Sequence, residues 1–388
     1  MDGDADAFGQ QLTSQPPPQQ GAVWSELRAP CRTRWWSHGR PHPRAPFEHL
    51  DPREFAFNSN LQFRSPCRIV SARSSVPDRP STARAGVNPI ERISLGDGIH
   101  VLRAAVNCGL VETDAGLVAI DTGLDRGAAN KLLRHAEELG MPLAAIVNTH
   151  AHADHHGGNA QLVRRTGVPV HAPAVEEVVI REPGYEPVYL FGGAEPIADL
   201  RNRFLQAEPS PVDHVFRPGE RFVIGGRELE AVDLAGHSLA QTGIRVGGVL
   251  FSADAFFGPA PLAKHGIPFL VDAGGMRASL QRLLTDPATH MVPGHGDVER
   301  EPAATLNENL AVLDRVFDWI TDSLNRGPSS TEDMLAEIAP VFGLRMDDPA
   351  AWVLNRAALL GFLSTMDREG TATVVMEHGR WLWAVGFE

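Results

Sequence analysis

Residues 149–158 read THAHADHHGG and place four histidines and one aspartate within seven consecutive positions. Imidazole and carboxylate groups are the usual protein ligands of zinc and of similar divalent metals. The four ligand-type side chains that begin this stretch are His150, His152, Asp154 and His155. Their spacing of i, i+2, i+4 and i+5 does not fit one face of a regular helix. We therefore predict a loop that curls around one ion or divides its ligands between two, with Gly157 and Gly158 permitting a tight entry into a following helix.

Three later segments place further ligand-type residues directly after apolar runs. These residues are His237 in GHS, Asp254 in SAD and His295 in PGHG, and Asp121 in LVAIDTG takes the same kind of position. Apolar runs of this kind predict buried strands, and open α/β sheets bind their ligands at the carboxyl ends of strands. A single histidine after a strand is usually structural. The repeated coincidence instead favours a metal site built at one edge of a sheet.

The elements that must position these residues alternate between strands and helices. Residues 98–123 contain short β-rich runs broken by Gly and Asp, and residues 126–140 predict a helix that ends at a glycine. The apolar run at residues 143–150 predicts a buried strand. Residues 221–238 and 242–256 predict hairpins with turns at IGG and VGG. This alternation predicts a layered α/β domain.

The last part of the chain has a different pattern. Residues 305–388 predict three helices followed by a hairpin that turns at His378 and Gly379, which is typical of a winged-helix domain. The first helix carries an apolar stripe, and a capping signal begins the second. The stripe consists of Leu310, Leu313, Phe317, Ile320 and Leu324. We expect this module to pack against the pocket or to mediate a homodimer; alternatively, its apolar stripe forms the core of the module itself.

The predicted division of the chain has three parts. Residues 1–88 are rich in Pro and Arg, show no sustained period and predict a disordered extension, either a docking tail or a dispensable one. Residues 89–304 form the α/β domain, and residues 305–388 form the winged-helix-like domain.

Composition narrows the function classes. The formal net charge of −13 disfavours binding to nucleic acid or to an anionic membrane. Residues 305–388 hold 13 acidic residues against six arginines, so they lack the basic face that phosphate contacts need. No apolar run predicts a transmembrane helix, and the acidic N-terminus carries no secretory signal. Three cysteines are too few for a disulfide framework. We therefore expect a cytoplasmic protein with a small-molecule substrate and no membrane partner.

The stretch THAHADHHGG resembles the THxHxDHxGG signature of the metallo-β-lactamase superfamily, and GHS, SAD and PGHG follow in that family's order. The resemblance covers roughly residues 90–300. It implies an αββα sandwich, in which two mixed sheets face each other between outer helices and the metals lie at one edge. It also implies that one metal is bound by His150, His152 and His237, a second by Asp154, His155 and His295, and that Asp254 bridges the two. Asp121 would brace the ligand loop.

The resemblance further implies a hydrolytic mechanism. Two divalent ions, about 3.5–4 Å apart in such sites, hold a bridging hydroxide that attacks the scissile bond. Zinc is expected, with iron or manganese as alternatives. Asp154 and Asp254 are the candidate catalytic residues, because either carboxylate could orient the nucleophile and pass its proton to the leaving group.

Several functions remain open on the sequence alone. We expect hydrolysis of a small ester, thioester or lactone. Alternatives are a metal-dependent phosphodiesterase or endoribonuclease, a mononuclear iron dioxygenase-type relative, and a regulator whose metal is structural. The bridging Asp254 and the absence of an export signal disfavour a β-lactamase. Candidate pocket residues are Tyr185 and Tyr189, in an insertion after the ligand loop that either forms a lid over an apolar pocket or packs on the surface. Lys264 and His265 are further candidates, which could meet an anionic substrate group.

Overall fold

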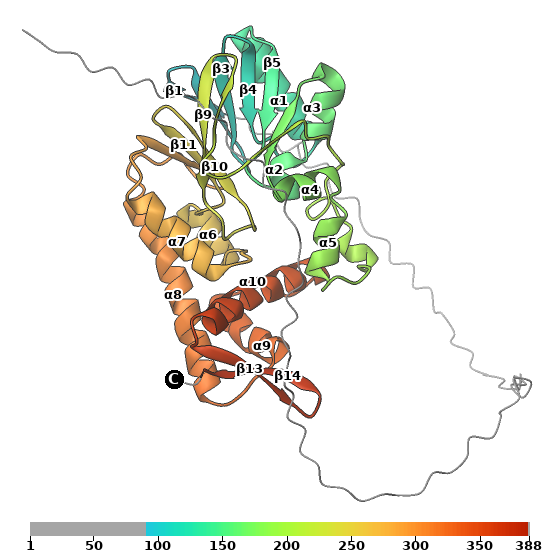
Figure 1. Ribbon diagram of the computed structural model, residues 1–388, viewed down its shortest axis with the longest axis vertical. Helices are drawn as coiled ribbons and strands as arrows, with labels where there is room; N and C mark the ends of the chain where they lie inside the picture. The colour runs from blue at the N-terminus through green and yellow to red at the C-terminus, as the bar shows by residue number, and fades with distance from the viewer. Residues whose placement is uncertain (1–90, 387–388) are drawn as a thin grey trace, which may run out of the picture. The chain divides into compact units, whose positions relative to one another are not determined.

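The computed structural model describes residues 91–386, and the predicted extension at residues 1–88 lies outside that range (Figure 1). A seven-stranded mixed sheet comes first. Its strands lie in the sheet in chain order, antiparallel from β1 to β4 and parallel from β4 to β7. Their bounds are β1 Glu91–Gly96, β2 Ile99–Arg103, β3 Cys108–Thr113, β4 Gly116–Ile120, β5 Leu143–Val147, β6 Val170–Pro173 and β7 His214–Phe216.

A five-stranded sheet follows, in the order β12-β11-β10-β9-β8. Its strands are β8 Arg221–Ile224, β9 Arg227–Asp233, β10 Thr242–Val246, β11 Val249–Ala253 and β12 His290–Pro293. The pair β11–β12 is parallel and the other neighbours are antiparallel. The predicted hairpins β8–β9 and β10–β11 are confirmed. Gly225, Gly226 and Gly247 in their turns have positive φ angles, a conformation that glycine adopts without strain.

The two sheets pack face to face, and helices cover both outer faces (Figure 1). Alternation along β4 shows how the sequence produces these layers. Val118 and Ile120 belong to the core between the sheets, together with Ile244 of the second sheet, whereas Leu117 and Ala119 pack beneath the outer helices. The predicted αββα sandwich is confirmed.

The helices of the sandwich lie between its strands in the chain. They are α1 Arg126–Leu139, α2 Ala153–His156, α3 Asn159–Thr166, α4 Glu176–Arg181, α5 Tyr185–Leu190, the short 3-10 helix η1 Ala198–Leu200, α6 Pro259–His265 and α7 Ala273–Leu284. The predicted α1 ends as expected, because Gly140 takes the left-handed conformation that closes a helix. No helix within residues 91–386 is both long and apolar enough to cross a membrane.

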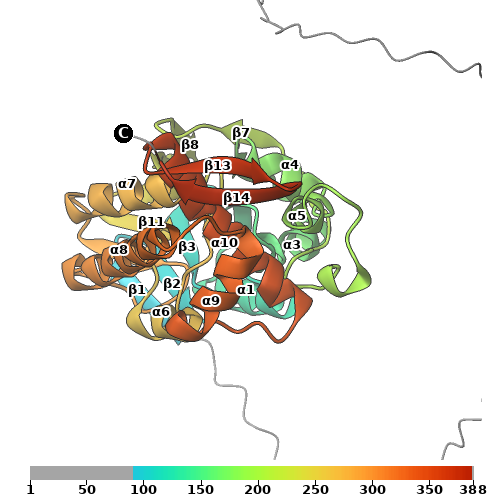
Figure 2. The same ribbon diagram turned by 90° about the horizontal axis from the view of Figure 1, so that it is seen from below.

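The C-terminal part contains the three predicted helices and the predicted hairpin. These are α8 Ala303–Asn325, α9 Thr331–Phe342, α10 Pro349–Arg368, β13 Ala372–Glu377 and β14 Arg380–Val385. The predicted cap is present, since the Ser330 side chain accepts a hydrogen bond from the backbone N–H of Asp333 at 3.1 Å. The hairpin packs against α8 and α10 (Figure 2). The identification of this C-terminal part as a winged helix stays a prediction, as does the division of the chain into domains.

The apolar core under these helices is continuous with the core under α6 and α7. Helix α10 also approaches the sandwich very closely at Gly361. A Cβ atom there would lie 2.8 Å from Leu270 Cδ1 and 3.0 Å from the backbone carbon of Val271, so only glycine fits this contact. Residues 91–386 therefore build one packed body in which α10 lies against the segment that precedes α7.

Candidate metal centre

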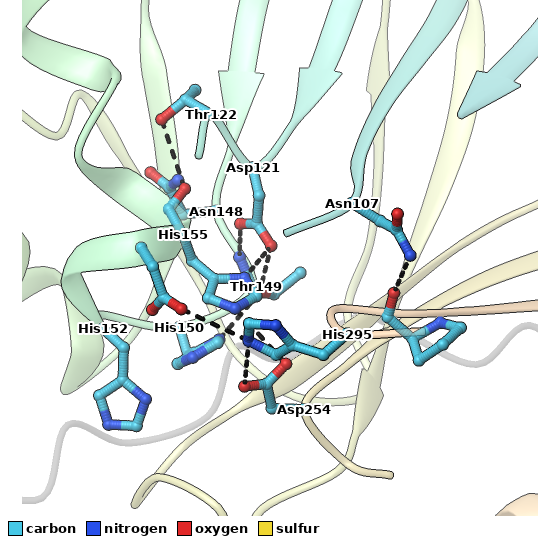
Figure 3. Close-up of polar contacts among 12 residues, drawn as sticks. Asn107, Asp121, Thr122, Asn148, Thr149, His150, His152, His155, Asp254 and His295 are labelled. Carbon is cyan, nitrogen blue, oxygen red and sulfur yellow. Dashed lines mark hydrogen bonds and ion pairs between the residues drawn. The ribbon is translucent and has the colours of Figure 1, made fainter. Parts of the chain in front are cut away.

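The structure brings all seven predicted ligands together. Each segment that carries them follows a strand: the 150–155 loop follows β5, and His237, Asp254 and His295 follow β9, β11 and β12. Figure 3 shows several of these side chains converging. Three groups have candidate ligand atoms within 4.8 Å of one another: His150, His152 and His237; His150, His155 and Asp254; and Asp154, His155 and His295. Strand ends that are far apart in the sequence thus deliver imidazole and carboxylate groups to one place.

Hydrogen bonds orient four of the histidine rings. In each ring Nδ1 contacts an oxygen of the protein, which leaves Nε2 facing the cluster. The contacts are His150 to Thr149 Oγ1 at 3.0 Å, and His155 to Asp121 Oδ2, His237 to the Phe269 carbonyl and His295 to the Ala105 carbonyl, each at 2.8 Å. Metal-binding histidines are oriented in this way, because a hydrogen bond at one nitrogen leaves the lone pair of the other free.

Several buried polar atoms of the cluster lack a hydrogen-bond partner. They include Nε2 of His150, Nε2 of His155 and Oδ1 of Asp254. A buried polar atom without a partner is costly, and such atoms need an explanation. Nδ1 of His152 and Nε2 of His237 lie only 2.8 Å apart, so two imidazole nitrogens point at the same place. This donor set fits divalent cations, which would satisfy all of these atoms at once.

The electrostatics of the cluster also favour cations. Burial, together with the neighbouring His237, lowers the pKa of His152 to about 3. Burial alone would lower the pKa of His295 as well, but Asp254 and Asp154 raise it to about 10. Burial would raise the pKa of Asp254, yet the surrounding histidines, His295 first, hold it well below the usual range. The carboxylates therefore draw positive charge into a buried site.

The ligand loop differs from the prediction in one respect. Asp154 and His155 lie on the single turn of α2, and His152 is the residue before that turn, whereas the sequence predicted a loop throughout. The two glycines after it both have right-handed φ angles, and both lie very close to neighbouring backbone, in agreement with the predicted tight entry. A Cβ at Gly157 would lie 2.0 Å from the Leu124 carbonyl oxygen. Close packing, not an unusual backbone conformation, therefore requires glycine here.

Asp121 lies behind the cluster, at the position predicted for a bracing residue (Figure 3). Its Oδ1 accepts a hydrogen bond from the Thr149 backbone N–H at 2.9 Å. Its Oδ2 accepts from the Thr149 hydroxyl at 2.7 Å and from His155 Nδ1 at 2.8 Å. One buried carboxylate thus holds both ends of the ligand loop. Its backbone has a positive φ of 56°, which is uncommon outside glycine.

Asn107 is a positioning residue that the sequence reasoning missed. Its side-chain amide donates to the carbonyls of Pro293 and Gly296, both at 2.8 Å, and its backbone N–H donates to the carbonyl of Gly294. These bonds hold the loop that carries His295 (Figure 3). No local sequence pattern marks such a contact, because the partners are backbone atoms 186 to 189 residues away.

A cavity of about 670 Å³ opens beside the cluster. Lys264 and His265 line it, as predicted. Tyr185 and Tyr189 are not among its lining residues, and both are about half exposed. Helix α5 instead turns the intervening Glu186 into the wall, where burial, with Asp154 and Glu176 nearby, raises the pKa of that carboxyl well above its usual range.

The C-terminal helices complete this cavity. Ala350, Ala351, Leu354 and Ala358 lie on one face of α10 and form part of the lining. Arg345 and Asp348, from the connection between α9 and α10, also line it. Figure 1 shows α10 crossing from α8 toward α5, so that the cavity has walls from both the sandwich and the C-terminal part. The predicted packing of this module against the pocket is therefore observed.

Comparisons with known proteins agree with this geometry. A family model for the metallo-beta-lactamase superfamily matches residues 102–295. A hydroxyacylglutathione hydrolase from Methylobacillus flagellatus is 28% identical over 241 residues, which cover 61% of this chain and 82% of that protein. Another, from Halorhodospira halophila, is 34% identical over 157 residues, 40% of this chain and 48% of that protein.

Solved structures show the same fold. A beta-lactamase domain protein from Burkholderia ambifaria is 17% identical with a TM-score of 0.61, covering 77% of this chain and 96% of its own. A metallo-beta-lactamase family protein from Thermus thermophilus is 20% identical with a TM-score of 0.60, covering 75% of this chain and 100% of its own. Both alignments cover more of this chain than the 194 residues of the family match, so the likeness extends beyond the sandwich.

Proposed function

The chain belongs to the metallo-β-lactamase superfamily as a metal-dependent hydrolase, and from that premise we propose that it cleaves a small ester, thioester or lactone with two divalent metal ions. This proposal rests on one observation above all. Buried nitrogen and oxygen atoms of the candidate ligands converge on one place, and several of them have no hydrogen-bond partner. His150, His152 and His237 would hold one ion. Asp154, His155 and His295 would hold the other, and Asp254 would contact both.

The proposed ions are zinc, with iron or manganese as alternatives. Bound divalent ions supply water activation at neutral pH and polarisation of the scissile bond. Asp254 is suited to holding them, because its oxygens lie 3.4 Å from Nε2 of His155, His237 and His295, and its side chain is buried. Asp154 is suited to moving a proton toward the leaving group, since its side chain is 30% exposed and lines the cavity.

The size of the cavity and the names of the relatives both support the proposed class of small ester-type substrates. A cavity of about 670 Å³ has the size of a small-molecule site. The two hydroxyacylglutathione hydrolases favour a thioester among the three ester-type substrates. The acidic surplus of residues 305–388, beside this cavity, argues against a nucleic acid substrate. We therefore propose a small-molecule substrate as the binding partner. Formation of a homodimer is the alternative role of the C-terminal part.

Metal removal tests this proposal. Dialysis against a chelator should abolish turnover of the accepted thioester or lactone, and addition of zinc should restore it, with two ions bound per chain. The measurement combines elemental analysis with a panel of thioesters, lactones and phosphodiesters. Turnover of phosphodiesters alone would favour the nuclease alternative. One iron per chain with oxygen consumption would indicate a dioxygenase, and bound metal without turnover would indicate a structural role.

Lys264 is expected to select anionic substrates. It is one of only two lysines in the chain, it lines the cavity, and it makes no ion pair within the described residues. Replacing Lys264 with Gln should raise the KM for an anionic substrate about fivefold, equivalent to about 1 kcal/mol, with kcat unchanged. The KM for a neutral analogue should not change. Lys131→Gln, on α1, is the matched control, and equal KM changes for both substrates would contradict the prediction.

A further inference from the structure

Glu176, the first residue of α4, is a buried carboxylate to which the proposed mechanism assigns no role. It is only 5% exposed. Its Oε2 accepts a hydrogen bond from the Ala151 backbone N–H at 2.9 Å. Its Oε1 accepts from the Ser238 hydroxyl at 2.7 Å and from the Ala240 backbone N–H at 2.8 Å. Three donors from two separate loops thus converge on one side chain.

These two loops carry one complete group of candidate ligands. Ala151 lies between His150 and His152, and Ser238 directly follows His237. The candidate ligand atoms of these three histidines lie within 4.8 Å of one another. The carboxylate therefore links the two backbone segments whose separation fixes the spacing of all three imidazoles. A backbone hydrogen bond between Thr242 and Thr149 is a further link between these segments, at 3.0 Å.

The surroundings of Glu176 show that its buried position is energetically unfavourable. Burial raises the pKa of Glu176, although hydrogen bonds from Ser238, Ala240 and Ala151 act in the opposite direction. No cation pairs with it among residues 91–386. The preceding residue, Val175, has a φ of 77°, which is a genuine outlier for a β-branched side chain. Such strain persists only where the surrounding structure imposes it.

We propose that Glu176 is a positioning residue that sets the spacing of His150, His152 and His237, so that binding of the metal by these histidines depends on it. The inference rests on the proposed function, because it assumes that the three histidines hold an ion. It adds a residue that contacts neither metal nor substrate and acts through the backbone of both ligand loops. Outer contacts of this kind typically change metal affinity about 10- to 100-fold.

Replacement with Gln changes one atom and keeps the shape. If the Gln oxygen faces Ser238 and Ala240, the amide NH₂ faces the Ala151 N–H, and two donors oppose each other. If the amide is turned over, its NH₂ faces the Ala240 N–H instead. Either orientation leaves one buried N–H without an acceptor, while Ala would leave all three donors unpaired. Loss of affinity should therefore increase from wild type to Glu176→Gln to Glu176→Ala.

The test is a zinc titration of the metal-free full chain in competition with a chromophoric chelator. Glu176→Gln should lower the affinity for one of the two zinc equivalents about 10- to 100-fold and leave the affinity for the other unchanged. Glu177→Gln is the matched control, because Glu177 pairs with Arg181 on the same helix and should leave both equivalents unchanged. Cobalt in place of zinc gives a second readout, since a displaced imidazole changes its visible spectrum.

The outcomes separate this inference from the proposed function. If the wild-type chain binds no zinc, the proposed function fails, and this inference falls with it. If the wild-type chain binds two ions and Glu176→Gln binds both equally tightly, only the positioning role is overturned. Should Glu176→Ala fail to fold, Ser238→Ala removes one of the three hydrogen bonds without altering the carboxylate. It should give a smaller loss at the same zinc equivalent, and no loss would count against the proposal.

Discussion

The His152→Ala variant is expected to lose both bound metal and turnover. Nδ1 of His152 lies 2.8 Å from Nε2 of His237, so the two rings point at the same place in the first ligand group. Removal of a proposed direct ligand should exceed the effect of outer contacts, which is about 10- to 100-fold on metal affinity. We therefore expect more than about a 100-fold loss of affinity and no measurable turnover.

This loss should not reflect unfolding. His152 lies before the single turn of α2, lines the cavity and is only partly buried, so its truncation opens space that water can fill. The measurements are elemental analysis, turnover and thermal unfolding of the metal-free protein. His135→Ala is the matched control, because this histidine lies on α1 and contacts Glu138 at the surface. A fully active, metal-replete His152→Ala protein would remove the basis of the proposed function.

Asp121→Asn is expected to lower the affinity for one of the two metal ions about 10- to 100-fold, although it replaces none of the proposed ligands. The carboxylate accepts three hydrogen bonds, from the backbone and hydroxyl of Thr149 and from His155. An amide cannot accept all three, because one of its two positions is itself a donor. If its NH₂ faces Thr149 N–H, the ligand loop loses an anchor. If it faces His155 Nδ1, the ring proton must move to Nε2, the nitrogen that faces the cluster.

The two cases can be measured separately. Loss of the loop anchor should lower the stability of the metal-free protein, since a buried N–H without an acceptor costs about 1–3 kcal/mol. A change of the His155 tautomer should instead appear in the nitrogen chemical shifts of its ring. Asp114→Asn is the control, because Asp114 precedes β4, at the opposite end of that strand from Asp121. Unchanged affinity for both zinc equivalents would show that Asp121 only supports the fold.

The sequence predicted which residues cluster as candidate ligands because these residues occur where strands end. His237, Asp254 and His295 each follow a run of apolar residues, and a buried strand fixes the place of the residue after it. Glu176 and Asn107 lack such a signal. Both act on backbone atoms of distant segments, and those contacts depend on the packed loops and not on residue types near them in the chain.

Helix phase and close packing explain the other differences between the predictions from the sequence and the structure. Tyr185 and Tyr189 were candidate pocket residues because they lie in an insertion after the ligand loop, but α5 turns Glu186 inward instead. The sequence predicted a tight entry into the next helix at Gly157 and Gly158, but not the contact that requires it. That contact is with the carbonyl of Leu124, and it depends on how α2 packs against the segment that follows β4. Neither the phase of a six-residue helix nor such an approach can be derived from local composition.

The contact at Gly361 has a consequence for how the two halves of this enzyme depend on each other. Gly361 packs against Leu270 and Val271, next to Phe269, and the carbonyl of Phe269 orients His237. Phe269 also packs with the N-terminal part of α10. A change that tilts this helix would therefore reach the imidazole of His237, a proposed metal ligand, through a single peptide segment. Exchange of the C-terminal helices to alter the substrate range is therefore expected to shift this proposed ligand as well, so that metal affinity would change together with specificity.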